Sequence, residues 1–216
     1  MNIEQVRFNM IEQQIRTWDV LNIDILDLLF KVKREGYVPA MYRSLAFMDM
    51  EIPLGHGVAM LAPKLEARIL QELDVKKTDK VLEVGSGSGY LTALLAELSA
   101  HVCSVEIVPE LKAMAERNLA GHGITNVSLE LGDASRGSSK HAPYDVIVLT
   151  GSTPVLPDAF QNSLNIGGRL FAVVGDAPAM EARLITRGAD SFTITTLFET
   201  CIPPLKNALQ PERFVF

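Results

Sequence analysis

The chain has 216 residues, of which 48% are apolar and 21% are charged, and its formal net charge is −6. This length and composition suit one large soluble domain, or one domain with an appendage. The acidic balance, with a pI near 5.3, argues against a nucleic-acid partner held by electrostatics, because phosphate binding needs a basic surface. Two cysteines, Cys103 and Cys201, are too few for a disulfide framework or a cysteine-based zinc site, and we predict no metal site.

The first ten residues, MNIEQVRFNM, are polar and of mixed charge, so they do not resemble a secretory signal. No apolar run approaches the ~18 residues that a membrane span needs. We therefore expect a cytoplasmic enzyme or binding protein with no membrane partner. The sequence makes no prediction of oligomeric state.

Residues 1–62 are predicted to form a helical extension on the substrate side of the protein. A first helix is indicated by apolar residues at helical spacing, namely Ile3, Val6, Met10, Ile15 and Trp18. Asn22 is a plausible N-cap for a second helix that carries Ile25, Leu28, Leu29 and Val32. An irregular stretch rich in Met, Pro and Gly is expected to follow, up to PLGHGVAMLAP.

Residues 63–216 are predicted to form one compact second unit in which helices and short apolar strands alternate. Prolines at 63 and 109 suit the first turns of helices, and Leu91 to Leu98 form a third helix. Five strands are expected in KVLEV, HVCSVE, NVSLELGD, YDVIVLT and GGRLFAVVG, with a short helix in LPDAFQNSLN. The segments ARLITR and SFTITTLFE, joined by GAD, are typical of an antiparallel hairpin.

This alternation predicts an α/β fold with a doubly wound, mostly parallel, seven-stranded Rossmann-like sheet, an N-terminal helical extension and a C-terminal antiparallel hairpin. Ligands of such sheets bind at the carboxyl ends of the strands. Asp145 begins a strand at the opposite end of the sheet, so we interpret it as structural. The C-terminal segment CIPPLKNALQPERFVF is expected to fold back on the domain.

A glycine-rich turn follows the first predicted strand, in the stretch VLEVGSGSGY. Gly85 and Gly87 fit the dinucleotide motif G-x-G-x-x-G, but its third position is Tyr90 and a glycine falls one residue early, at Gly89. In the dinucleotide motif the third glycine allows close helix packing beside a pyrophosphate. We interpret Gly89 as leaving an open turn that accepts a bulkier, uncharged group.

Three carboxylates lie at or near the ends of consecutive strands. Glu106 ends the second strand and is placed to accept the hydroxyls of a ribose. Glu83, inside the first strand, would repel a diphosphate and attract an ammonium, and Asp133 offers an acceptor to an adenine amino group. A nucleoside that carries a cationic amino acid, such as S-adenosylmethionine, matches all three.

Each of these carboxylates also has a simpler interpretation. Glu83 is equally suited to bind the amides of the turn, Glu106 to be a solvated strand end, and Asp133 to be a turn residue. Thr150, after the fourth strand, suits a ligand-facing loop or an ordinary connection. Their joint placement on consecutive strand ends favours the cofactor.

The stretches VLEVGSGSGYLTALLA, HVCSVE, NVSLELGD and YDVIVLTGSTPVLP resemble the class I methyltransferases. REGYVP and IPLGHGVAMLAP resemble, in order and spacing, N-terminal segments of the protein-L-isoaspartate O-methyltransferase family, so the resemblance covers nearly the whole chain. It implies an S-adenosylmethionine-dependent O-methyltransferase that methylates an isoaspartyl or D-aspartyl carboxylate of a peptide and so begins protein repair. The cofactor pocket that it implies is lined by Glu83, Gly85, Ser86, Gly87, Gly89, Glu106, Asp133 and Ala134, and Ile107 and Thr150 complete the predicted set.

One segment departs from the family pattern. Where the family has Thr, an aliphatic residue and Ser, this chain has Ala59, Met60 and Leu61 over the same length, so the active-site hydroxyls are replaced by apolar groups. His56 is the nearest polar candidate, although a surface loop histidine is its simpler interpretation. No catalytic residue is assigned.

Losing the hydroxyls does not in itself abolish methyl transfer, because a carboxylate acceptor is already ionised at neutral pH. It does remove a hydrogen-bonding group on which acceptor recognition depends. Two alternatives therefore remain open beside an isoaspartyl peptide acceptor. One is a methyltransferase on the same scaffold with a small-molecule acceptor, and the other is a non-catalytic protein that binds S-adenosylmethionine or its product.

Overall fold

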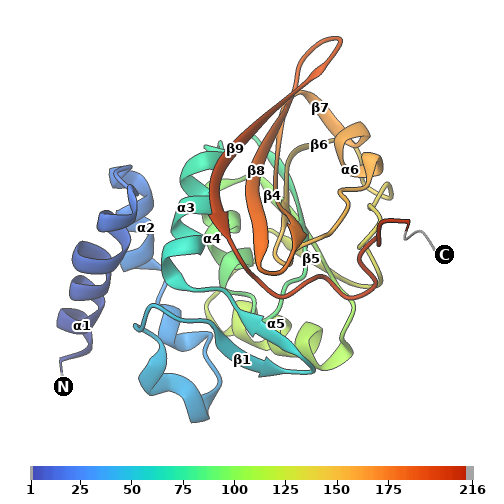
Figure 1. The fold of residues 1–216 in the computed structure, drawn as a ribbon. Helices are drawn as coiled ribbons and strands as arrows, with labels where there is room; N and C mark the ends of the chain where they lie inside the picture. Colours follow the sequence, from blue (N-terminus) through green and yellow to red (C-terminus); the bar gives the residue numbers. More distant parts are fainter. Residues whose placement is uncertain (1, 213–216) are drawn as a thin grey trace.

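A seven-stranded sheet in the order β5-β4-β3-β6-β7-β8-β9 forms the centre of the computed structural model, which describes residues 2–212 (Figure 1). Pairing is parallel from β5 through β7 and antiparallel between β7, β8 and β9. The predicted fold class is confirmed. The strands are β3 (Lys80–Val84), β4 (His101–Glu106), β5 (Val127–Leu131), β6 (Tyr144–Leu149), β7 (Leu164–Asp176), β8 (Ala179–Arg187) and β9 (Phe192–Thr200).

The central strands are apolar along their length because both faces of the sheet are covered. On β3, Val81 belongs to one buried cluster and Leu82 to a second cluster on the other face. Figure 1 shows α3 (Pro63–Leu73) and α4 (Tyr90–Leu98) on one side of the sheet and α6 (Asp158–Asn162) on the other. Helix α5 (Pro109–Gly121) packs against β4 and β5. Both predicted proline starts, at Pro63 and Pro109, are confirmed.

Helix α6 ends earlier than the sequence predicts. Its last residue is Asn162, and β7 already begins at Leu164, which pairs with Tyr144 at the start of β6. Leu164 is fully buried in the same apolar cluster as Phe160, and this burial favours its place at the start of β7. Asp145 is structural, as expected, because its carboxylate accepts hydrogen bonds from the Lys80 amide (2.9 Å) and the Asn165 side chain (2.7 Å).

The first helices of the N-terminal extension lie outside α3 and α4, at the left of Figure 1. Helix α1 (Ile3–Met10) continues through a π-helical turn, η1 (Ile11–Ile15), and a 3-10 turn, η2 (Arg16–Trp18). In α2 (Ile23–Lys31), Asn22 is the N-cap, as predicted, and its Oδ1 accepts a hydrogen bond from the Asp24 amide at 2.9 Å.

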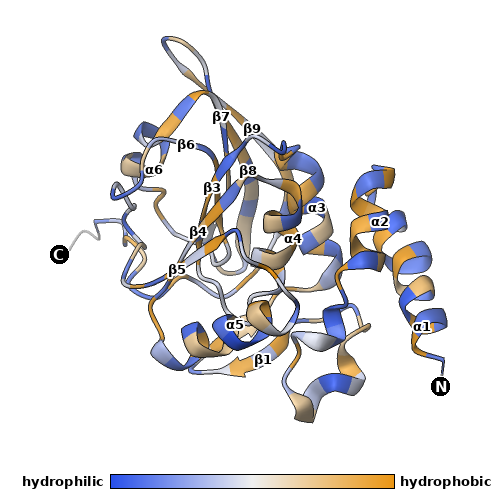
Figure 2. Ribbon diagram, turned by 180° about the vertical axis from the view of Figure 1, so that it is seen from behind, coloured by the Kyte–Doolittle hydropathy of each residue, from blue (hydrophilic) through white to orange (hydrophobic). Residues whose placement is uncertain are grey.

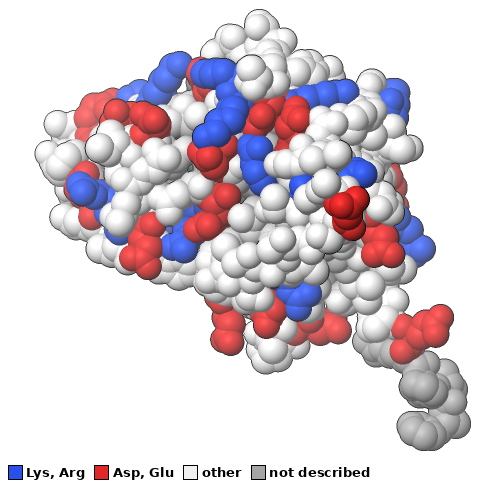
Figure 3. Space-filling model, turned by 90° about the horizontal axis from the view of Figure 1, so that it is seen from above, with Lys and Arg blue, Asp and Glu red and all other residues white. Residues whose placement is uncertain are grey.

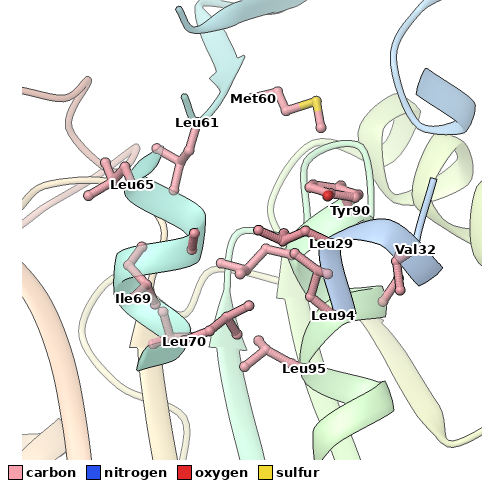
Figure 4. Packing of buried hydrophobic residues seen from close by; sticks show 14 of the residues in the cluster. Leu29, Val32, Met60, Leu61, Leu65, Ile69, Leu70, Tyr90, Leu94 and Leu95 are labelled. Carbon is pink, nitrogen blue, oxygen red and sulfur yellow. The ribbon is translucent and has the colours of Figure 1, made fainter. Parts of the chain in front are cut away.

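Helix α2 is largely hydrophobic in Figure 2. Its residue Leu29, and Val32 just after it, belong to the same buried cluster as Leu94 and Leu95 of α4 (Figure 4). The extension and the sheet therefore share one core. The division at residue 62 stays a prediction.

The stretch between residues 34 and 62 is more ordered than the sequence predicts. It contains 3-10 turns η3 (Arg34–Gly36) and η4 (Ala40–Leu45), followed by an antiparallel hairpin of β1 (Ile52–Gly55) and β2 (Val58–Met60). The hairpin turns through three consecutive residues with positive φ, at Gly55 (87°), His56 (54°) and Gly57 (74°). Glycine adopts positive φ without steric cost, so Gly55 and Gly57 allow the chain to turn here.

The C-terminal segment folds back on the domain, as predicted, over the residues that the structure describes. The Leu205 amide donates to the Ser152 carbonyl (2.9 Å), and the Ser152 amide donates to the Pro203 carbonyl (3.0 Å). Residues 213–216 of the predicted fold-back lie outside the described range. None of the helices within residues 2–212 is long and apolar enough to cross a membrane.

Replacing Asn22 with Ala removes the acceptor that caps α2, and we expect the free energy of unfolding to fall by about 1 kcal/mol. Asn22→Asp keeps a side-chain oxygen and is expected to retain most of the stability. Urea unfolding followed by circular dichroism measures both variants. Equal destabilisation by Ala and Asp would show that the cap hydrogen bond does not stabilise the helix.

Candidate functional site

A solvent-open cleft lies at the carboxyl ends of β3, β4, β5 and β6, and its empty space of about 930 Å³ includes open solvent. Its floor is the glycine-rich turn after β3, and its walls come from the residues that follow β4, β5 and β6. The β1–β2 hairpin and the C-terminal segment 203–206 complete it on the side away from the sheet. Segments far apart in the sequence therefore converge at the sheet edge where ligands of such folds bind.

The glycine-rich turn is held close to the neighbouring strands. Gly85 (φ 95°) and Gly87 (φ 51°) have backbone conformations that favour glycine, and the Gly85 amide donates to the Val105 carbonyl at 2.8 Å. A Cβ at Gly85 would clash with Thr150 Oγ1. Thr150 in turn donates to the carbonyls of Val84 and Gly85, both at 2.9 Å. The turn therefore fits tightly over the end of β6.

Gly89 does not leave the open turn that the sequence analysis expects. It does not line the cleft, and a Cβ on it would lie 3.2 Å from the Cα of Ala115 in α5. Its φ of 83° also starts α4 from the left-handed region. Gly89 therefore allows α4 to approach α5 closely, which is a packing role like that of the third glycine in dinucleotide sites.

Glu106 binds the turn and remains on the cleft surface. Its Oε2 accepts a hydrogen bond from the Gly87 amide and its Oε1 from the Val108 amide, both at 3.0 Å. The side chain lines the cleft although the residue is only 3% exposed. Because a carboxylate has about four acceptor positions, it retains capacity for the hydroxyls of a ligand.

Glu83 is fully buried at the end of β3 and also lines the cleft. Its Oε2 accepts hydrogen bonds from Thr92 of α4 (2.5 Å) and Ser104 of β4 (2.6 Å), while its Oε1 has no partner. Burial raises the pKa of Glu83 to about 7, although the hydrogen bonds from Ser104 and Thr92 act in the opposite direction. A cationic ligand would give the unpartnered oxygen its missing interaction.

Asp133, after β5, is fixed by two hydrogen bonds. Its Oδ1 accepts from the Ser135 amide (2.9 Å) and its Oδ2 from Asn207 Nδ2 (2.8 Å). Burial alone would raise the pKa of Asp133, but the bonds from Asn207 and Ser135 hold it below its usual value. The carboxylate is therefore ionised and available as an acceptor at the cleft.

The structure brings most of the predicted cofactor residues together. All except Gly89 line the cleft, namely Glu83, Gly85, Ser86, Gly87, Glu106, Ile107, Asp133, Ala134 and Thr150. Ser86 Oγ, like Glu83 Oε1, is buried without a hydrogen-bond partner. Unsatisfied polar atoms are costly in a protein interior, so their position on a cleft wall fits a polar ligand such as S-adenosylmethionine.

The segment of Ala59, Met60 and Leu61 forms an apolar wall of the cleft. Ala59 is half-buried, whereas Met60 and Leu61 are 4% and 5% exposed and belong to the buried cluster that also contains Tyr90 (Figure 4). All three line the cleft. His56 does not line it and is exposed at the tip of the hairpin, so its predicted surface position is observed.

A buried ion pair behind this wall was not anticipated from the sequence. Arg34 pairs with Glu66 and donates to the carbonyls of Leu61 (2.7 Å) and Ala46 (3.0 Å), and its guanidinium lies over Tyr90. Both charged residues are at most 2% exposed. Burial raises the pKa of Glu66 above its ordinary value, although Arg34 acts in the opposite direction. Arg34 and Glu66 lie 32 residues apart in the sequence, so no local sequence pattern predicts their pairing.

Charged groups are mixed on the face shown in Figure 3, where acidic and basic side chains alternate without a broad basic area. Within residues 2–212, no group of three or more His, Cys, Asp or Glu side chains is arranged to hold a metal ion. The walls of the cleft carry both acidic and apolar side chains.

Comparison with known proteins gives a consistent result. The family model described as Protein-L-isoaspartate(D-aspartate) O-methyltransferase (PCMT) matches residues 5–209. A protein-L-isoaspartate O-methyltransferase from Methanoculleus marisnigri is 37% identical over 200 residues, which cover 92% of this chain and 90% of that protein. The protein of that name from Methanothrix thermoacetophila is 40% identical over 169 residues, with 77% and 80% covered.

A solved structure shares the fold. A Plasmodium falciparum protein, crystallised in complex with S-adenosyl-L-homocysteine, matches with a TM-score of 0.78 over 95% of this chain and 98% of that chain. The sequence identity is 21%, so this likeness establishes the fold alone.

The raised pKa of Glu83 predicts how stability depends on pH. Because its folded pKa of about 7 exceeds the usual 4.5, the folded state binds the proton more tightly than the unfolded chain. This stabilisation is fully present below about pH 4.5 and is lost as pH rises through 7. Glu83→Gln keeps an acceptor oxygen but does not ionise, so its stability relative to wild type should rise between pH 5 and 8, by at most about 3 kcal/mol.

Denaturant unfolding of the ligand-free wild type and of Glu83→Gln at both pH values measures this difference. Glu130→Gln is a matched control at the exposed end of β5, where Lys140 and His141 lower the carboxyl pKa. The prediction would be contradicted if the difference in unfolding free energy between Glu83→Gln and wild type were the same at pH 5 and pH 8.

Proposed function

The chain belongs to the protein-L-isoaspartate(D-aspartate) O-methyltransferase family of S-adenosylmethionine-dependent enzymes, and from this premise we propose that it methylates an isoaspartyl or D-aspartyl carboxylate of a peptide. One observation carries the proposal. The predicted cofactor residues, with the exception of Gly89, line a single cleft that continues past them to the β1–β2 hairpin and the C-terminal segment. The cleft therefore has a cofactor half and a second half with space for an acceptor.

In the cofactor half, we assign the ribose hydroxyls to Glu106, whose carboxylate is oriented by the Gly87 and Val108 amides. Glu83 Oε1 and Ser86 Oγ, both without partners, take the amino-acid end of the ligand. Asp133 takes the adenine amino group with its remaining acceptor capacity. In this arrangement the Glu83 carboxylate pairs with the ligand ammonium, and Glu106 accepts hydrogen bonds from the ribose hydroxyls. The buried polar atoms of the cofactor half then have partners.

Bound S-adenosylmethionine supplies a methyl group that is electrophilic because it is attached to a sulfonium. The acceptor carboxylate needs no general base, since it is ionised at neutral pH. The protein then contributes alignment of the acceptor oxygen and exclusion of water. Ala59, Met60 and Leu61 supply the dry wall, and Arg34 fixes it through the Leu61 carbonyl.

A second candidate acceptor is a small, partly apolar carboxylate. The observation in its favour is the same wall, because Ala59 and Leu61 offer no side-chain hydrogen bond where the family has hydroxyls. A site without such groups discriminates weakly between polar acceptors.

Transfer of labelled methyl groups to matched peptides, one with isoaspartate and one with normal aspartate, tests the function. The preparation must first be shown to bind S-adenosylhomocysteine. Labelling of the isoaspartyl peptide alone is the expected result. Labelling of small carboxylates instead would favour the second candidate, and labelling of neither would refute both.

The ribose assignment predicts that Glu106→Gln weakens S-adenosylhomocysteine binding about 10- to 100-fold. The amide has one oxygen where the carboxylate has two, so either Gly87 or Val108 loses its acceptor and the ligand loses a charged one. Titration calorimetry measures the affinity, with Glu130→Gln as the matched change outside the cleft. Unaltered affinity in Glu106→Gln would refute the assignment.

A further inference from the structure

The C-terminal segment forms one wall of the cleft, beside the loop that follows β6. Its Pro203 and Leu205 backbones are bonded to both sides of Ser152, and Ser152 Oγ donates to the Ile202 carbonyl at 3.1 Å. The segment lies so close to the loop after β6 that a Cβ on Gly151 would be 2.9 Å from the Leu205 amide nitrogen. Residues 203–206 therefore have a defined position over the cleft.

Asn207 anchors the other side of Lys206. Its side chain donates to Asp133 Oδ2 at 2.8 Å, and its carbonyl accepts from Ser135 Oγ at 3.2 Å. Its φ of 59° turns the chain at this point. Because Leu205 and Asn207 are both held, the backbone of Lys206 is fixed at the cleft while its side chain is exposed.

The charges of the cleft make this lysine distinctive. Among the described residues that line the cleft, four are acidic, Glu66, Glu83, Glu106 and Asp133, and Lys206 is the only basic one. Arg34 neutralises Glu66, whereas within residues 2–212 Lys206 takes part in no ion pair. The carboxylates that Arg34 does not neutralise would repel an anionic acceptor, and the side chains of the apolar wall give it no hydrogen bond. Its one available countercharge on the protein is the Lys206 ammonium.

We propose that Lys206 binds the carboxylate of the methyl acceptor, an inference that rests on the proposed methyl transfer to a carboxylate. One carboxylate oxygen pairs with Nζ, and the other attacks. The new bond joins that oxygen to the methyl carbon, the bond between methyl and sulfur breaks, and its electron pair stays on sulfur. The products are a methyl ester and S-adenosylhomocysteine, so one negative and one positive charge disappear together.

This assignment gives Lys206 a role in both binding and release. The ionised acceptor gains an ion pair in a partly enclosed cleft, which compensates for the missing hydroxyls. The neutral ester cannot form that pair, so the product is held less tightly than the acceptor. Lys206 thus selects the chemical class of the acceptor, a free carboxylate, without specifying the rest of the molecule.

The test compares Lys206→Met and Lys206→Arg with wild type and with Lys31→Met, a control whose lysine pairs with Glu97 and does not line the cleft. Labelled methyl transfer gives KM and kcat for an isoaspartyl peptide and for succinate, and calorimetry gives the affinity for S-adenosylhomocysteine. We expect Lys206→Met to raise KM about tenfold with cofactor affinity unchanged. Lys206→Arg should restore most of the loss, and Lys31→Met should behave as wild type.

The outcomes separate this inference from the proposed function. Peptide methylation with an unchanged KM in Lys206→Met overturns the role of Lys206 and leaves the proposed function standing. Methylation of succinate alone, with the same dependence on Lys206, supports the inference and overturns the peptide acceptor. If the cofactor-binding protein methylates neither compound, both are overturned.

Discussion

A carboxylate buried near the carboxyl end of β3 is the constraint around which the site is organised. Glu83 is fully buried, and the hydroxyls of Thr92 and Ser104 bind one of its oxygens, which links β3 to α4 and β4. A buried charge is costly unless it is paired, and this one has a second oxygen without a partner. The unpartnered Oε1 of Glu83 therefore destabilises the ligand-free fold, and the same atom attracts a cationic ligand.

The two halves of the cleft are built in different ways. The proposed cofactor half comes from the ends of parallel strands. Backbone amides orient Glu106 and Asp133, whereas the hydroxyls of Thr92 and Ser104 orient Glu83. The acceptor half comes from a hairpin and a returning C-terminal segment, which are held by Arg34 and Asn207. Rigid strand ends suit a constant cofactor, whereas attached segments allow acceptor recognition to change by substitution, as at Ala59 and Leu61.

Sequence reasoning predicted the sheet correctly, and the proposed cofactor residues other than Gly89 line one cleft, because both depend on local patterns. Apolar runs, proline starts and carboxylates at strand ends all lie within a few residues of the features they predict. The β1–β2 hairpin was missed because its strands are short, and Gly89 was misinterpreted because its neighbour, Ala115, comes from another helix. The Arg34–Glu66 pair and the position of Lys206 depend on contacts between distant segments, which spacing does not encode.

Titration of the protein with S-adenosylhomocysteine between pH 6 and pH 8 tests most directly whether Glu83 meets the ligand charge. If only the ionised carboxylate binds the ammonium, a pKa of about 7 predicts an affinity about tenfold higher at pH 8 than at pH 6. The Glu83→Gln variant should bind weakly and without this pH dependence. Equal affinity of the wild type at both pH values would show that Glu83 is a structural partner of α4 and β4 alone.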